Sequence, residues 1–162
     1  MTKDIIPDDF TLTLALVDGL PVLFFAGSMI LISLMFRNKL FLFGALLCLF
    51  AGLSKVFWKI IVVLRRKNIW FLFLQMRITM PIGMIMILSS LFIEKIEIKI
   101  LLSYLLSFPS NIFFTIGMLL MLAMLVFAFT LDNSKKSNNW IEQITNIIAQ
   151  LSFFIGILLI VL

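Results

Sequence analysis

Four charged residues lie within long hydrophobic stretches of this chain: Asp18, Lys55, Lys59 and Arg77. An ionisable side chain inside a membrane-spanning helix costs about 2.5–3.5 kcal/mol on insertion scales, so such a residue usually has a partner or a task. One carboxylate would neutralise one cation of this set, and the remaining positive charge would attract an anion. The four residues therefore predict a cationic cavity that binds a small anion or a lipid headgroup.

A second interpretation of the same residues is that they mark the membrane interface. Long basic side chains extend toward the headgroups while their methylene stems stay in hydrocarbon. Lys55 and Arg77 would then be topology signals near the ends of their helices. Asp18, three residues before Pro21, would begin a helix, with residues 10–17 as an interfacial segment. The sequence leaves both interpretations open.

The sequence offers little for catalysis or metal binding. It contains no histidine, the commonest general base and transition-metal ligand, and its single cysteine, Cys48, excludes an intrachain disulfide. Nucleotide-binding, hydrolase and metalloprotease motifs are absent. Met76, Met80, Met84 and Met86 offer thioether ligands for Cu(I), although methionine more often fills gaps in an apolar core. We expect no enzyme activity, no metal and no cofactor.

The composition points to a membrane protein. Of the 162 residues, 63% are hydrophobic and 13% are charged, whereas a soluble domain is about 45–50% apolar and about 25% charged. The net charge of +5 comes from basic residues beside apolar runs, which favours anionic lipid headgroups as partners and argues against nucleic acid. A secretory signal peptide is not expected, because Met1–Asp9 carries three aspartates and one lysine.

Run lengths predict the fold. A bilayer core of about 30 Å needs about 20 mostly apolar residues per helix, and the runs are about twice as long as a barrel strand requires. Five runs qualify, and we expect helices over residues 10–36, 40–64, 68–93, 110–131 and 139–162. The predicted fold is therefore an all-α polytopic membrane protein with about five transmembrane helices in a single domain.

A shorter segment separates the third and fourth runs. Residues 96–108 begin with alternating charges and continue into an apolar stretch too short to cross the membrane. We expect an amphipathic piece that lies along the membrane surface or forms a shallow re-entrant turn. Pro109 and Ser110 then supply a start for the fourth helix.

The basic residues predict an orientation. Side A, defined as the side of the N-terminus and of the loops at residues 65–67 and 134–138, carries Lys3, Arg65, Arg66, Lys67, Lys135 and Lys136. Side B carries Arg37, Lys39, Lys95 and Lys99. Lys55, Lys59 and Arg77 fall in the side-A halves of their helices, and all three tryptophans, Trp58, Trp70 and Trp140, fall toward side A. By the positive-inside rule we expect side A and the N-terminus to be cytoplasmic, in a bacterial inner membrane.

Helical spacing predicts that the charged residues converge. Asp18, Lys55 and Arg77 all lie about 12–14 Å from side A at a rise of about 1.5 Å per residue. Lys55 and Lys59 continue a stripe that contains Gly44, Cys48 and Gly52. Small residues on such a stripe let a neighbouring helix approach closely. We expect Asp18 to pair with Lys55 or Arg77 inside the bundle.

The last run contains a second stripe of small residues. Ser152 and Gly156 are one helical turn apart, and Thr145 and Ala149 extend the stripe. It would serve either as a homodimer face or as a contact with a neighbouring helix of the same chain. The contact within the chain is the favoured interpretation.

These observations leave two classes of function. The first is a transporter- or channel-like protein with a cytoplasm-facing cationic cavity, supported by the one-sided charges and by the Pro and Gly interruptions near residues 19–21 and 81–83. The second is a non-catalytic subunit, assembly factor or immunity-type partner of a larger membrane complex, which suits the short loops. Either class allows a homo-oligomer.

Overall fold

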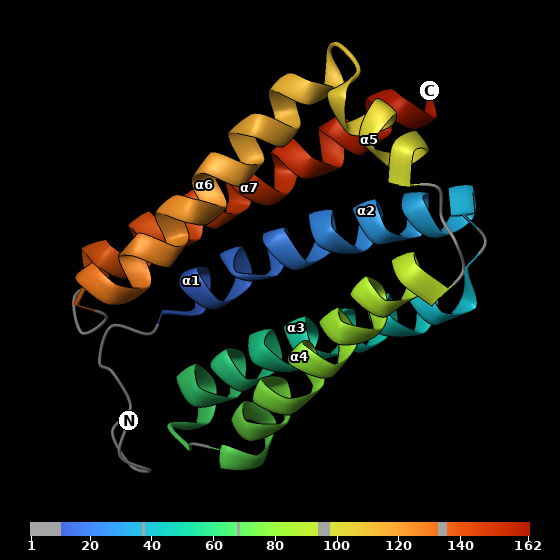
Figure 1. Cartoon of the computed structure of the whole chain (residues 1–162). Helices are drawn as coiled ribbons and strands as arrows, with labels where there is room; N and C mark the ends of the chain where they lie inside the picture. Colours follow the sequence, from blue (N-terminus) through green and yellow to red (C-terminus); the bar gives the residue numbers. More distant parts are fainter. Residues whose placement is uncertain (1–10, 37, 68, 94–97, 133–135) are drawn as a thin grey trace.

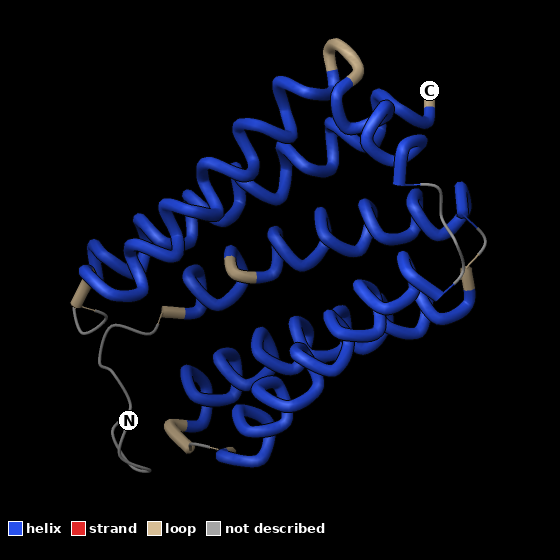
Figure 2. The backbone as a smooth tube through the Cα atoms, in the orientation of Figure 1, coloured by secondary structure: helices blue, strands red, loops and turns tan. Residues whose placement is uncertain are grey.

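The computed structural model describes residues 11–36, 38–67, 69–93, 98–132 and 136–162. This part of the chain is almost entirely helical and contains no strand (Figure 2). The helices are α1 (Leu12–Val17), α2 (Gly19–Phe36), α3 (Lys39–Arg65), α4 (Trp70–Ile93), α5 (Ile98–Leu106), α6 (Ser110–Thr130) and α7 (Lys136–Val161).

Within the described residues, five stretches are long and apolar enough to cross a membrane. They are Leu12–Met35, Lys39–Arg65, Trp70–Ile93, Ser110–Thr130 and Ser137–Val161. The shortest has 21 residues, which at about 1.5 Å per residue still covers a hydrocarbon core of about 30 Å. The prediction of an all-α polytopic fold is confirmed, with α7 beginning three residues before the expected Asn139.

The spanning helices form three layers (Figure 1). α1 and α2 together make the central layer, which packs on α3 on one side and, through α2, on α7 on the other. α4 packs along α3 and α6 packs along α7, so each outer layer is an antiparallel helix pair. The start of α1, the end of α3, the start of α4, the end of α6 and the start of α7 lie at one end of the bundle, and the C-terminus lies at the other (Figure 1).

Side-chain and backbone caps define the ends of α3. The Asn38 side chain accepts a hydrogen bond from the Phe41 N–H at 2.8 Å, and its amide nitrogen donates to the Ser90 carbonyl of α4 at 3.5 Å. Arg66 ends the helix in the left-handed conformation, with φ 48°, and its N–H donates to the Val62 carbonyl. These caps satisfy backbone groups that the helix itself leaves free, which allows short connections on both sides of α3.

Small residues allow close contact between α6 and α7. A Cβ added to Gly156 would lie 3.2 Å from the Phe114 ring, and one added to Gly117 would lie 3.0 Å from the Phe153 ring. Each aromatic ring therefore fills the space left by a glycine on the partner helix. The α7 stripe packs within the chain, as predicted, with Ala149 fully buried.

The segment between the third and fourth spans forms the nine-residue helix α5, which packs against α6. A helix of nine residues is about 14 Å long and cannot cross the membrane. Tyr104 and Leu105 line a small apolar cavity of about 80 Å³ with Ile32, Ile157 and Ile160. α5 thus lies against the side-B ends of α2 and α7, in agreement with the predicted amphipathic segment.

The odd number of spans predicts opposite locations for two reporter fusions. A fusion at Ser137, at the start of the last span, should report side A, and one after Leu162 should report side B. We expect alkaline phosphatase to be inactive at Ser137 and active after Leu162, because the positive-inside rule predicts that the side with more basic residues, side A, is cytoplasmic. Fusions that report the same side would mean that one of the five stretches does not cross the membrane.

Candidate functional site

Asp18 lies at the junction of α1 and α2. Pro21 has no N–H to donate to the Val17 carbonyl, and its ring crowds that carbonyl, so the regular helix is interrupted here. Asp18 keeps right-handed helical angles, φ −62° and ψ −16°, and its N–H donates to the Leu14 carbonyl at 3.0 Å. The chain therefore continues from α1 into α2 as one 24-residue stretch, Leu12–Met35, and Asp18 lies within that stretch instead of at its start.

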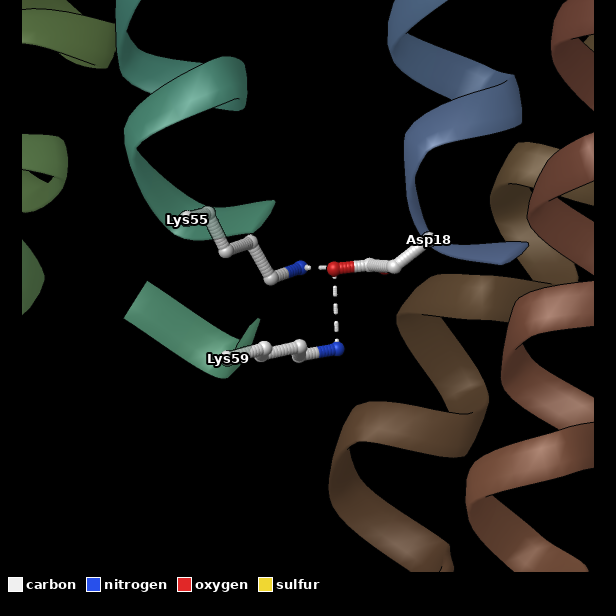
Figure 3. Close-up of polar contacts among 3 residues, drawn as sticks. All are labelled: Asp18, Lys55 and Lys59. Atoms are coloured by element: carbon white, nitrogen blue, oxygen red, sulfur yellow. Dashed lines mark ion pairs between the residues drawn. The ribbon is translucent and has the colours of Figure 1, made fainter. Parts of the chain in front are cut away.

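Two lysines of α3 bind the Asp18 carboxylate. Lys59 Nζ lies 2.8 Å from Oδ2 and Lys55 Nζ lies 3.8 Å from Oδ1 (Figure 3). Residues four apart share one face of a helix, so both lysines reach the same carboxylate. The side chains of Asp18 and Lys59 are 3% and 8% exposed, whereas that of Lys55 is 38% exposed. The sequence predicted Lys55 or Arg77 as the partner. Lys55 does contact the carboxylate, but the shortest contact is with Lys59, which is also the more deeply buried of the two lysines.

A cavity of about 450 Å³ lies beside this ion pair. Its volume is within the range of about 300–1,000 Å³ that is common for small-molecule sites. All five spanning stretches contribute to its lining, which comprises Asp18, Pro21, Val22, Phe25, Cys48, Gly52, Lys55, Met76, Arg77, Met80, Pro81, Met121, Asn146 and Gln150. Three of the four charged residues predicted from the sequence, Asp18, Lys55 and Arg77, thus line one cavity. The fourth, Lys59, does not line the cavity but forms an ion pair with Asp18.

The polar lining groups lie at one depth in the bundle. Arg77 is seven residues after Trp70, the first residue of α4, which places it about 10 Å along the helix. Lys55 is ten residues before Arg65, the last residue of α3, or about 15 Å from the same end. The polar part of the cavity therefore lies in the side-A half of the bundle, well inside the ends of its helices, and the lining extends past the middle of α3 at Cys48.

Two uncharged donors on α7 complete the polar part of the lining. Asn146 and Gln150 are one turn apart and face the cavity, and the Gln150 amide donates to Met121 Sδ of α6 at 3.8 Å. The positions of Asn146 and Gln150 along α7 follow from the sequence, but the direction in which their side chains point does not. Only the packing of α7 against α2 turns this face toward Lys55 and Arg77.

The three tryptophans that were predicted to lie toward side A differ in burial. Trp58 is 6% exposed and packs inside the protein, next to Lys59 on α3. Trp70 and Trp140 are half-buried near the side-A ends of α4 and α7. Trp58 lies toward side A, as predicted, but it is buried because this face of α3 points toward the bundle and not toward lipid.

Cys48 is expected to resist polar thiol reagents in the folded protein. It is 1% exposed, and its thiol donates to the Met80 carbonyl at 3.7 Å. A charged maleimide should label it slowly, whereas a cysteine introduced at the exposed Ser137 in a Cys48→Ser background should react rapidly. Cys48 lines the cavity, so rapid labelling would show that water fills the cavity at this depth and would support an open channel over a site closed to water.

The fold and the cavity define the class: a polytopic α-helical membrane protein with a charged cavity among its spanning helices. Comparison with protein-family models, with curated proteins and with solved structures finds no match for the chain. The function is therefore inferred from the geometry and charge of the cavity.

Proposed function

We propose that the protein is a transporter-like membrane protein that binds an anionic group in this cavity. The proposal rests on the distribution of charge. Two cationic side chains, Lys55 and Arg77, line the cavity together with one carboxylate, Asp18. Lys59 lies 2.8 Å from that carboxylate. The lining therefore has a net positive charge even when the full negative charge of Asp18 is included. A negatively charged ligand balances this charge in a site that is otherwise mostly apolar.

The chemistry of the polar groups suits an oxyanion. Arg77 offers a planar guanidinium that can donate two parallel hydrogen bonds to a phosphate or carboxylate. Lys55 contributes a compact positive charge, and the amides of Asn146 and Gln150 contribute neutral donors. These four side chains support binding of an oxyanion, because each can donate hydrogen bonds to it and two of them carry a positive charge.

The orientation follows from the distribution of basic residues. With side A in the cytoplasm of a bacterial inner membrane, the charged half of the cavity lies on the cytoplasmic side, where anionic headgroups and organic anions are available. Membrane lipids are the proposed partners. A cavity within one chain requires no second copy, so self-association is not part of the proposal.

Binding of anionic probes tests this function. Purified protein in a neutral detergent is offered glycerol 3-phosphate or phosphatidylglycerol, each compared with its uncharged or zwitterionic counterpart, glycerol or phosphatidylcholine. We expect one or both anions to be retained in native mass spectrometry and to raise the Tm. Arg77→Gln should weaken retention by about tenfold or more, because a charge-assisted hydrogen bond is worth about 1.5–3 kcal/mol.

The matched control is Arg65→Gln. Arg65 is an exposed cation near the side-A end of α3 and does not line the cavity. Its replacement removes the same charge from the same end of the bundle, so it should leave anion retention unchanged. Equal losses in both variants would indicate a general charge effect, and retention of neither anion by the wild type would refute the proposed function.

A further inference from the structure

The cavity is bordered on one side by two helices that do not pack together. α4 packs along α3 and α6 packs along α7, and among the described residues α4 and α6 make no extensive contact with each other. The lining residues that these two helices supply include Arg77, Met80, Pro81 and Met121, all of which are exposed. By contrast, Pro21 of the central layer is buried. The cavity is therefore a groove with its floor on α2 and α3 and its opening between α4 and α6.

This opening lies at the depth of the hydrocarbon. Met121 is nine residues before Thr130, the last residue of α6, or about 14 Å from the side-A end of that helix. Arg77, on the opposite rim, is about 10 Å from the side-A end of α4. Acyl chains, not water, surround a spanning helix at this level. A ligand that enters between α4 and α6 therefore comes from within the bilayer.

The lining is polar in one part and apolar in another. Lys55 and Arg77 supply positive charge, while Met76, Met80 and Met121 supply flexible apolar walls toward the opening. Methionine surfaces adapt to ligands of irregular shape, such as acyl chains. An amphiphile with a negatively charged head and an apolar tail matches both parts, whereas a small hydrophilic anion matches only the first.

We propose that the groove is a lateral binding site for an anionic phospholipid. The lipid phosphate lies between Lys55 and Arg77, and an acyl chain leaves the groove between α4 and α6 past Met80 and Met121. This inference rests on the proposed function and specifies its ligand as an anionic lipid and its route of entry as lateral. It also implies that the bound headgroup lies deeper than those of the surrounding bilayer, because Lys55 and Arg77 are about 10–15 Å from the helix ends.

Competition between a lipid and its soluble headgroup tests the inference. Wild-type protein is loaded with phosphatidylglycerol in mixed micelles with phosphatidylcholine and is then exposed to excess glycerol 3-phosphate. We expect phosphatidylglycerol to be retained in preference to phosphatidylcholine and not to be displaced by glycerol 3-phosphate. Displacement of phosphatidylglycerol by this excess would overturn the lateral lipid site and leave the proposed anion binding intact. Retention of neither anion would refute both.

A bulky substitution on the rim distinguishes lipid binding in the groove from lipid binding on the outer surface of α6. Met121→Trp narrows the opening, and Met118→Trp is its control, because Met118 is 63% exposed on the same helix and does not line the cavity. Retention of phosphatidylglycerol should fall severalfold in Met121→Trp and stay unchanged in Met118→Trp, while the Tm without lipid is similar in both. Equal retention in the two variants would overturn the inference.

Photocrosslinking locates the acyl chain. Phosphatidylglycerol with a diazirine in its chain should crosslink mainly to peptides of α4 and α6 that contain Met80 and Met121, and Arg77→Gln should abolish this preference. Crosslinks spread evenly over all outward helix faces would identify ordinary surrounding lipid and contradict the site.

Discussion

Replacing Asp18 by Asn is expected to lower the free energy of unfolding by about 3–5 kcal/mol, because removal of one partner of a buried ion pair takes away the opposite charge closest to the other partner. Lys59 is that other partner: its side chain is 8% exposed and its ammonium lies 2.8 Å from the carboxylate. The loss should appear as a large drop in Tm in detergent and in a reversible unfolding titration in mixed micelles. Lys39→Met, which removes an exposed charge at the other end of α3, is the control and should have little effect.

Double variants identify the partner of Asp18. Asp18→Asn combined with Lys59→Met removes both buried charges and should recover much of the lost stability, since an apolar replacement of a buried pair is often nearly neutral. Asp18→Asn combined with Lys55→Met should recover less, because Lys55 is 3.8 Å away and 38% exposed. Additive effects of the Asp18 and Lys59 substitutions would mean that the two residues do not interact.

Replacing Gly83 by Ala is expected to destabilise the protein by up to about 2 kcal/mol, because overpacking a tight contact usually costs about 1–3 kcal/mol and the helix preference of alanine regains about 1 kcal/mol. A Cβ at Gly83 would lie 2.7 Å from the Gly44 carbonyl oxygen and 2.6 Å from Cys48 Sγ. The carbonyl belongs to the backbone of α3, so relief requires the two helices to separate.

Gly19→Ala provides the matched control. A Cβ at Gly19 would have its nearest neighbour at 3.9 Å, the Cγ1 of Val56, which is an ordinary contact. This substitution should therefore be neutral or slightly stabilising in the same unfolding experiment. A similar loss at both glycines would show that helix flexibility, and not the close α3–α4 contact, accounts for the effect at Gly83.

Hydrophobic run lengths alone were sufficient to predict the five spanning helices. The bilayer requires about 20 apolar residues per helix, and polar residues between the runs end each helix within a few positions of where the structure ends it. The depth of Asp18, Lys55 and Arg77 was also predictable, because helical rise converts sequence position directly into distance along the helix. These properties are local, so no knowledge of neighbouring helices was needed.

The tertiary structure decided which helices are neighbours and how each is rotated about its axis. Gly44 and Gly52 share a stripe in the sequence, yet Gly44 faces Gly83 of α4 whereas Gly52 faces Val22 of α2. For the same reason Lys59, and not Lys55 or Arg77, makes the closest contact with Asp18, and Trp58 is buried. In a chain that is apolar on nearly every face, hydrophobicity does not distinguish the side of a helix that meets protein from the side that meets lipid. Rotation is set instead by close packing and by pairing of buried charges, which depend on residues far apart in the sequence.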